Sequence, residues 1–119
     1  MELRIENQAR GMRIISGDTA KQRRLLLNEL IGIAEYEGFE EISLPSVEPS
    51  KVYSDKAGTE VLGQMYVFPD KKGRDLCLRP EATATIQLIA DKHFKKRKDL
   101  KLWYFERCWR YEKPQEGRY

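Results

Sequence analysis

The alternation of residue types over residues 101–112 limits the fold of this chain more than any other feature. Aromatic side chains fall on one parity, and a mixed set ending in opposite charges falls on the other: Trp103, Phe105, Trp109 and Tyr111 against Leu102, Tyr104, Cys108, Arg110 and Glu112. Because successive side chains of a strand point to opposite faces, the pattern predicts a strand that carries Arg110 and Glu112 on one side. Residues 113–118 contain the Pro and Gly of a loop, which puts Arg118 beyond the strand. Two arginines around one site favour a phosphate or carboxylate ligand, but an edge strand with solvated charges explains the pattern equally well.

Two amphipathic helices are expected, over residues 18–37 and 81–93. The first has a broad apolar face and ends before Gly38, an isolated glycine that is typical of a left-handed C-terminal cap. In the second, Glu81 and Thr83 stand at the N-terminus. From the pattern alone, Glu81 complements the helix dipole and Thr83 caps the helix, which is the commonest use of both residue types there.

Short strands and turns are expected between these helices. Residues 39–44 form a predicted strand that Pro45 stops, because proline cannot donate to a ladder. A helical turn follows over residues 50–55. Residues 66–68 and 76–78 flank a segment with proline, aspartate and glycine, which predicts a β-hairpin. We therefore expect an α+β fold: a mainly antiparallel sheet with the two helices packed against it.

Length and composition bound the class of protein. At 119 residues the chain is one domain at most, and 40% hydrophobic with 34% charged residues indicates a folded, soluble protein. The net charge of +3 permits an anionic partner such as tRNA or ATP but does not require one. No apolar run reaches membrane-spanning length and the N-terminus has no hydrophobic signal region, so we expect a cytoplasmic protein with no membrane partner.

The cysteines and the one histidine do not indicate a metal site. Cys77 and Cys108 lie in strand-like apolar settings without CxxC spacing, so no zinc site or disulfide is predicted and both are expected to be buried thiols. His93 falls in a basic run over residues 92–100 and is interpreted as a helix-end residue. The run could lie along tRNA phosphates, although a solvated connector is the favoured interpretation.

Four blocks resemble, in the same order, segments of histidyl-tRNA synthetases, which are class II aminoacyl-tRNA synthetases. The blocks are Arg10–Arg13 (Arg-Gly-x-Arg), Gly38–Pro49 (the end of motif 1 with its proline), Leu78–Thr83 (Leu-Arg-Pro-Glu-x-Thr) and Arg110–Tyr119 (the motif 2 strand and loop). The Pro-Gln-x-Gly-Arg run in the last block separates that family from its class II relatives. The resemblance implies one domain over residues 1–119, the N-terminal part of a catalytic core, with motif 1 at about 18–49, the amino-acid segment at 78–83 and the first motif 2 strand and loop at 101–119.

The resemblance also implies a reaction and roles for particular residues. Histidine carboxylate attacks the α-phosphate of ATP, and the histidyl group then passes to tRNA. Arg110 matches the catalytic arginine that holds the α-phosphate and the substrate carboxylate, Glu112 the residue that contacts adenine, and Arg118 the arginine that reaches the γ-phosphate. Glu81 matches the acceptor of the α-amino group, helped by Thr83. ATP and magnesium are expected as a substrate complex, without a tightly bound cofactor.

This sequence departs from the family pattern in three ways. Glu106-Arg107 stands where a Gly-Pro pair is usual, and Lys113 replaces the usual arginine. The sequence also stops inside the motif 2 loop, so the returning strand, motif 3 and the anticodon-binding domain are not in it, and we expect it to be incomplete for catalysis alone. A homodimer through the motif 1 helix and strand is implied. The alternative is a non-catalytic regulatory, tRNA-binding or dimerisation module derived from such a synthetase.

Overall fold

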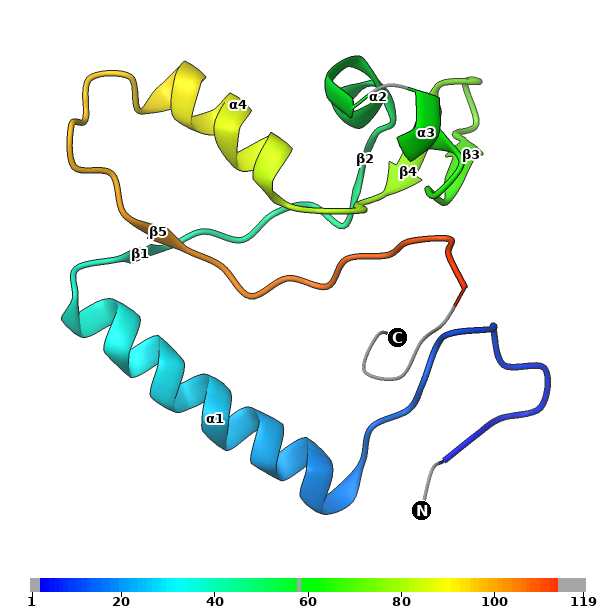
Figure 1. Ribbon diagram of the computed structural model, residues 1–119, viewed down its shortest axis with the longest axis horizontal. Coiled ribbons are helices and arrows are strands. Elements are labelled where there is room, and N and C mark those ends of the chain that lie inside the picture. Colours follow the sequence, from blue (N-terminus) through cyan, green and yellow to red (C-terminus); the bar gives the residue numbers. More distant parts are fainter. Residues whose placement is uncertain (1–2, 58, 114–119) are drawn as a thin grey trace. The chain divides into compact units, whose positions relative to one another are not determined.

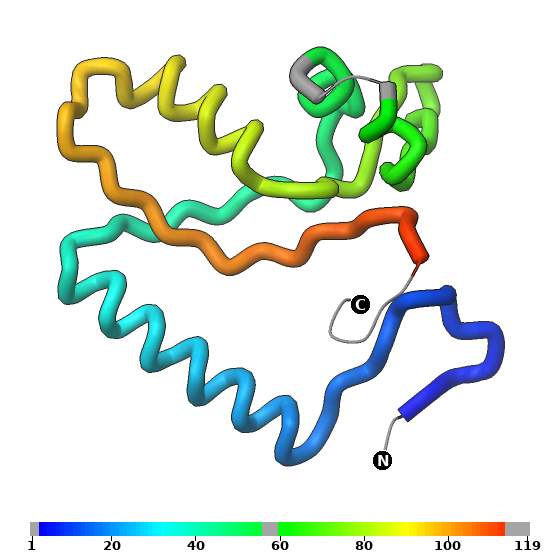
Figure 2. Tube along the Cα trace, viewed as in Figure 1, coloured from blue at the N-terminus to red at the C-terminus, as the bar shows by residue number. Residues whose placement is uncertain are grey.

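The computed structural model describes residues 3–57 and 59–113 of the chain. They divide into two compact units, one within residues 3–39 together with Lys113 and the other over residues 40–112 (Figures 1 and 2). The single domain and the motif boundaries that the sequence predicts stay predictions. Among the described residues, no helix has both the length and the apolar character that crossing a membrane would require.

The first unit is built around helix α1, Gly17–Tyr36, which confirms the first predicted helix. Its end is a Schellman motif: the Phe39 N–H donates to the Ala34 carbonyl at 2.9 Å and the Gly38 N–H to the Glu35 carbonyl at 3.0 Å. Gly38 has a φ of +80°, as the predicted left-handed cap requires.

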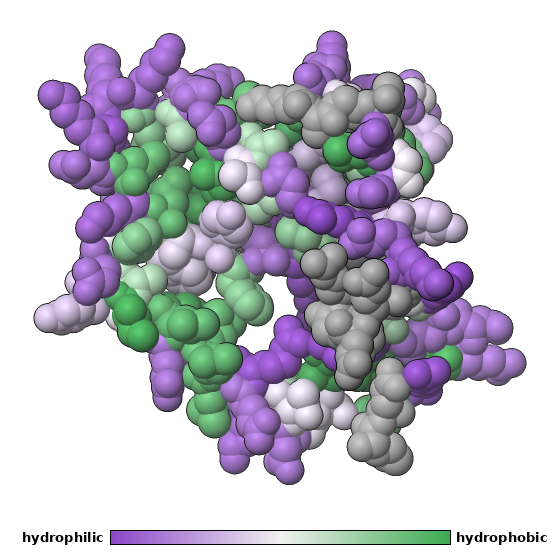
Figure 3. Space-filling view, in the orientation of Figure 1, coloured by the Kyte–Doolittle hydropathy of each residue, from purple (hydrophilic) through white to green (hydrophobic). Residues whose placement is uncertain are grey.

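Helix α1 buries none of its residues within the chain. Its exposed apolar side chains are Leu25, Leu26, Leu30, Ile33 and Tyr36. Figure 3 shows hydrophobic residues uncovered over the C-terminal half of this helix. An amphipathic helix normally buries its apolar stripe, so this surface is suited to contact with another element.

The second unit contains a three-stranded antiparallel sheet in the order β2-β4-β3. Strands β3 (Val67–Pro69) and β4 (Asp75–Leu78) form the predicted hairpin, and β2 (Val47–Pro49) pairs with the other edge of β4. In the hairpin turn the Asp70 carboxylate accepts hydrogen bonds from the backbone N–H groups of Lys72 at 2.8 Å and Arg74 at 2.9 Å. These bonds, first that from Arg74, lower the pKa of Asp70.

A second, two-stranded sheet pairs β1 (Glu40–Glu41) with β5 (Leu102–Trp103) in parallel. The sequence predicted longer strands, over 39–44 and 101–112, and did not predict a parallel pair. Beyond Trp103 the chain makes single backbone hydrogen bonds to separated carbonyls rather than a ladder, so regular strand structure stops there. The expected aromatic face is lost with it, since Phe105 and Tyr111 are exposed.

Three helices complete this unit: α2 (Lys51–Ala57), α3 (Thr59–Leu62) and α4 (Thr83–His93). Helix α2 confirms the predicted turn after Pro49, and α4 confirms the second predicted helix with His93 as its last residue. Helix α4 has its most extensive contact with α2. Its first turn also reaches the sheet, as expected, because the Thr85 hydroxyl donates to Glu48 of β2 and Ala84 packs against the cluster that contains Cys77 of β4.

The core of the second unit is small and lies between α2 and β4. Tyr53, Met65 and Cys77 form it, with Val52, Val61 and Ala84 packed against them. Cys77 has no exposed surface, and burial raises the pKa of its thiol. Cys108 is exposed. The prediction of two buried thiols is therefore confirmed for Cys77 and wrong for Cys108, whose segment lacks the neighbouring strands that would cover it.

Candidate active site

A buried arginine sets the frame of the candidate site. Arg79 follows β4 and is only 1% exposed. Its guanidinium donates hydrogen bonds to the carbonyls of Leu44 (3.0 Å), Pro45 (2.7 Å) and Arg107 (2.8 and 3.0 Å), and to the Glu106 carboxylate at 3.2 Å. Because one rigid planar group meets all these acceptors, it ties the segments around residues 44 and 106 to the end of β4.

Glu106 completes this frame from the C-terminal segment. Its carboxylate accepts hydrogen bonds from the Leu44 backbone N–H at 2.7 Å and the Ser43 hydroxyl at 3.1 Å, besides pairing with Arg79. The pKa of Glu106 is lowered, first by the Leu44 N–H. Glu106 thus ties the C-terminal segment to residues 43, 44 and 79, a role that the sequence did not reveal.

Two backbone hydrogen bonds then bring Arg110 to the start of α4. The Trp109 N–H donates to the Arg79 carbonyl at 2.9 Å and the Tyr111 N–H to the Gln64 carbonyl at 2.8 Å. Arg110 lies between these two anchored residues, and its Nε donates to the Pro80 carbonyl at 3.2 Å. This is the one hydrogen bond of its side chain within the described ranges, so most of its donor fork is left for other acceptors.

A pocket of about 190 Å³ opens beside Arg110. Its lining is Tyr53, Val61, Gln64, Pro80, Glu81, Ala84 and Arg110. The walls are mostly apolar, with one carboxylate and one guanidinium among them. Beside apolar walls, charged groups of a ligand would interact with these two side chains more strongly than in bulk solvent.

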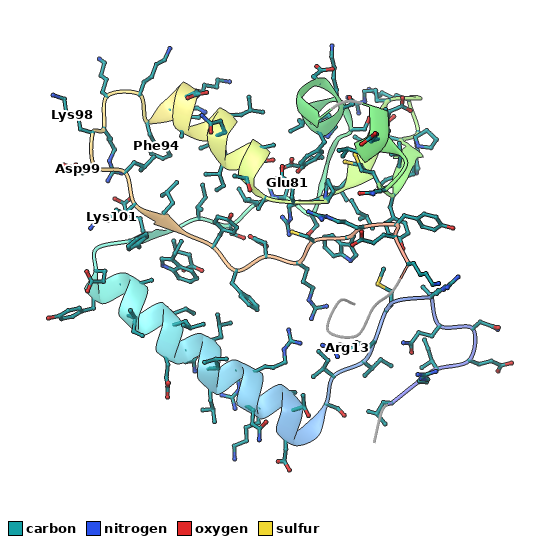
Figure 4. The ribbon with its side chains drawn as sticks, viewed as in Figure 1. Arg13, Glu81, Phe94, Lys98, Asp99 and Lys101 are labelled. Carbon is teal, nitrogen blue, oxygen red and sulfur yellow. The ribbon has the colours of Figure 1, made fainter. Side chains whose placement is uncertain are left out.

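Glu81 enters the pocket from the turn that precedes α4, where Figure 4 labels it. Its carboxylate accepts hydrogen bonds from the N–H groups of Thr83 at 2.6 Å and Ala84 at 3.1 Å. Glu81 therefore caps the helix, and the Thr83 side chain, which was assigned this role in the simplest interpretation, does not. Two of about four lone-pair sites of the Glu81 carboxylate are used, which leaves acceptor capacity for a ligand.

The structure brings together two of the five predicted site residues. Glu81 and Arg110 line one pocket although 29 positions separate them in the sequence. Thr83 and Glu112 are exposed and are not among the lining residues. Arg118 lies outside the described residues. The assigned roles of all five stay predictions.

Sequence reasoning missed Tyr53 and Gln64 as lining residues. The segment over 59–65 had no clear periodicity, and Gln64 reaches the site through its backbone bond to Tyr111. Tyr53 is set by a buried polar group: its hydroxyl donates to the Glu48 carboxylate at 2.8 Å, and the Thr85 hydroxyl donates to the same oxygen. No local pattern marks such a meeting of three elements.

One residue of the basic run over 92–100 has a structural role. Arg97 forms a two-point ion pair with Glu40 of β1, which lowers the pKa of Glu40, and its guanidinium lies 5.7 Å from the Phe94 ring centroid. Lys98, at the outer bend of this connection in Figure 4, points away from the protein. A solvated connector, the favoured interpretation, agrees with this arrangement.

Comparison with solved structures identifies the class of fold. The chain matches an ATP phosphoribosyltransferase regulatory subunit/histidyl-tRNA synthetase from Bacillus halodurans with a TM-score of 0.74 and 24% identity, over 92% of this chain and 29% of that one. It matches the RNA binding domain of threonyl-tRNA synthetase from Cryptosporidium parvum with a TM-score of 0.78 and 16% identity, over 94% and 28%. At such identities these matches show the fold, which is that of part of a class II aminoacyl-tRNA synthetase.

Sequence comparison narrows this class to one family. The model of the histidyl-tRNA synthetase family matches residues 11–119. Histidine–tRNA ligase from Archaeoglobus fulgidus is 40% identical over 111 residues, which cover 92% of this chain and 27% of that protein. The enzyme from Methanosarcina acetivorans is 40% identical over 115 residues, which cover 95% and 28%. The chain belongs to the histidyl-tRNA synthetase family, and it spans little more than a quarter of the length of these relatives.

Proposed function

We propose that this chain carries the first half of a histidyl-tRNA synthetase active site and binds histidine, and the phosphate end of ATP, at the pocket that Glu81 and Arg110 line. The observation that carries the proposal is the shared pocket itself: an acidic and a basic side chain from distant segments line one largely apolar cavity. Such a pair of opposite charges suits a ligand that has an ammonium and an oxyanion. The alternative class, a non-catalytic binding module, would use the same pocket without turnover.

The pocket size favours an amino acid or one end of a nucleotide over a whole ATP molecule. Its volume of about 190 Å³ is below the roughly 300–1,000 Å³ of sites that enclose drug-sized ligands. The histidine ammonium would be accepted by the free lone pairs of Glu81, and we assign Thr83 a helping role on the motif match alone. The backbone N–H bonds that Glu81 accepts hold its carboxylate in place, so a ligand need not order it.

Arg110 would act on the phosphate side. Its Nε bond to the Pro80 carbonyl fixes the side chain, and its remaining N–H groups can hold the histidine carboxylate against the α-phosphate and stabilise the charge that develops at phosphorus. Magnesium, entering with ATP, would supply further neutralisation of phosphate charge. We assign Glu112 to adenine and Arg118 to the γ-phosphate on the motif match alone. The catalytic half-site would thus position substrates without a covalent intermediate.

Calorimetric titration tests this function. ATP with magnesium, and separately histidine, is titrated into the purified chain, its Arg110→Ala variant and the matched Arg107→Ala variant. Arg107 is also exposed and lies three residues away, and its side chain does not line the pocket. We expect Arg110→Ala to weaken ATP binding about 10- to 100-fold, as loss of a charge-assisted hydrogen-bonding partner should, and Arg107→Ala to change it less than threefold. Equal weakening in both variants would show a general charge effect and would remove the Arg110 assignment.

The exposed apolar side of α1 favours a second candidate function, assembly. Five large hydrophobic side chains of one helix are uncovered in the isolated chain, a surface that fits a homodimer through motif 1 or docking onto a full synthetase. The mass in solution of the titrated samples separates the two candidates. A folded dimer that binds neither ATP nor histidine would support assembly and contradict the substrate site. We propose no more for tRNA than that the exposed lysines of residues 92–98 are available to its phosphates.

A further inference from the structure

A buried carboxylate behind the pocket meets two hydroxyl groups. Glu48, in the middle of β2, is 6% exposed. One of its oxygens accepts hydrogen bonds from the hydroxyls of Tyr53, in α2, and Thr85, in α4, and the two hydroxyl oxygens lie 3.3 Å apart. Burying a carboxylate destabilises a fold unless hydrogen bonds satisfy its lone pairs. The two bonds to Glu48 therefore stabilise the contact of β2 with α2 and α4.

Both hydroxyl donors are connected to the pocket surface. Tyr53 is one of the residues that line it, although Tyr53 is only 2% exposed. Thr85 is 9% exposed and sits in the first turn of α4, directly after the two residues whose N–H groups Glu81 accepts. The Tyr53 wall of the pocket and the helix that Glu81 caps are therefore both attached to the buried Glu48 carboxylate.

The hydroxyl of Tyr53 is suited to a permanent donor role. Burial, and next to it the Glu48 carboxylate, raises the pKa of this phenol well above its ordinary value, so the proton stays on the oxygen at neutral pH. A tyrosine fixed at its phenolic end cannot swing its ring into the cavity. The ring instead stays as a wall of constant shape.

We infer that Glu48, Tyr53 and Thr85 are positioning residues of the ligand pocket, which set the distance between the Tyr53 wall and the Glu81 carboxylate that receives the ligand ammonium. The inference rests on the proposed function for the identity of the ligand, while the geometric part stands on the hydrogen bonds alone. Binding groups must be held to about 0.5 Å for productive geometry, and loss of either hydroxyl frees one side of the pocket.

Two deletion variants and one rescue variant test the inference. Tyr53→Phe and Thr85→Val each remove one hydroxyl and nearly keep the side-chain volume. Thr85→Ser changes the same position but keeps the hydroxyl donor. Leu44→Ala is the control. The Leu44 side chain is buried in the same unit and does not line the pocket, and the Leu44 bonds to Arg79 and Glu106 come from backbone groups that alanine keeps. The variant should therefore lower stability without changing the bonds among Glu48, Tyr53 and Thr85. Histidine affinity is measured by calorimetry, and exchange of the Thr83 and Ala84 amide protons by NMR.

We expect Tyr53→Phe and Thr85→Val to weaken histidine binding at least tenfold and to speed exchange of both amides at least tenfold. Thr85→Ser and Leu44→Ala should stay within threefold of the wild type in both measurements, even where Leu44→Ala lowers the melting temperature as much as the deletions do. A wild type that binds histidine together with deletion variants that bind it equally well would overturn the inference. If the wild type does not bind histidine, the proposed function is refuted. The positioning role is still tested in that case by amide exchange: if the Thr83 and Ala84 amides exchange at the wild-type rate in both deletion variants, the positioning role is refuted as well.

Discussion

Arg79 and Arg110 are neighbours in space with opposite uses. Arg79 is buried and donates to acceptors in two other segments of the chain, with all three of its side-chain nitrogens engaged. Arg110 is exposed and makes one side-chain hydrogen bond within the described part of the chain, to the Pro80 carbonyl. An arginine has a structural role when the protein itself supplies the acceptors for its N–H groups. It is available for ligand binding when those N–H groups have few acceptors within the protein.

The largest expected effect separates these two arginines by stability. Arg79→Ala removes the cation that pairs with the Glu106 carboxylate and the donor to three backbone carbonyls, so we expect it to lower the free energy of unfolding by about 3–5 kcal/mol. Arg110→Ala should lower it by less than about 1 kcal/mol, because an exposed side chain with one hydrogen bond is removed. Urea denaturation followed by circular dichroism measures both variants. Similar losses of unfolding free energy in the two variants would mean that Arg110, like Arg79, is a structural residue.

The Glu81→Gln variant tests whether the acidic side chain of the pocket, like Arg110, acts on a ligand more than on the fold. Glu81→Gln keeps one oxygen that can accept from the helix N-terminus, loses the second acceptor and removes the negative charge. We expect histidine affinity to fall about tenfold, the loss of one charge-assisted bond. Stability should fall by about 1–2 kcal/mol, from one lost hydrogen bond and the lost charge at the helix end. Calorimetry and thermal unfolding report the two quantities. Histidine affinity that stays within threefold of the wild type would withdraw Glu81 as the ammonium acceptor.

The smallest effect concerns pH and the partner of Arg79. The pKa of Glu106 is lowered in the folded state, so its ionised form stabilises the fold. This contribution is complete above the ordinary glutamate value of 4.5 and is lost as the pH falls through the lower folded pKa. The difference in melting temperature between the wild type and Glu106→Gln should therefore be larger at neutral pH than at acidic pH.

The matched control for this pH dependence is Glu41→Gln, which changes an exposed carboxylate of the same unit. Its melting temperature should differ little from the wild type at either pH. A gap for Glu106→Gln that stays constant as the solution is acidified would show that shape, and not charge, decides the role of Glu106.

The helices were predictable because their signals are local. The period of apolar residues and Gly38 placed the end of α1, and Asp70 with Gly73 supplied the hairpin turn. Strand lengths were not predictable in the same way. A strand continues only where a neighbouring chain segment offers a matching row of donors and acceptors, and the alternation over 101–112 contains no information on that neighbour.

The sequence by itself determined the family, two long helices, the hairpin and the chemical types available for a site, because motifs and periodicities are properties of neighbouring residues. Only the tertiary structure decided that Arg79 serves the fold while Arg110 lines a pocket, and that the Glu48 carboxylate accepts hydrogen bonds from both Tyr53 and Thr85. These outcomes depend on which hydrogen-bonding groups meet across tens of residues. A side chain's type states what it can donate or accept, whereas its use depends on the partners that the fold brings within about 3 Å of it.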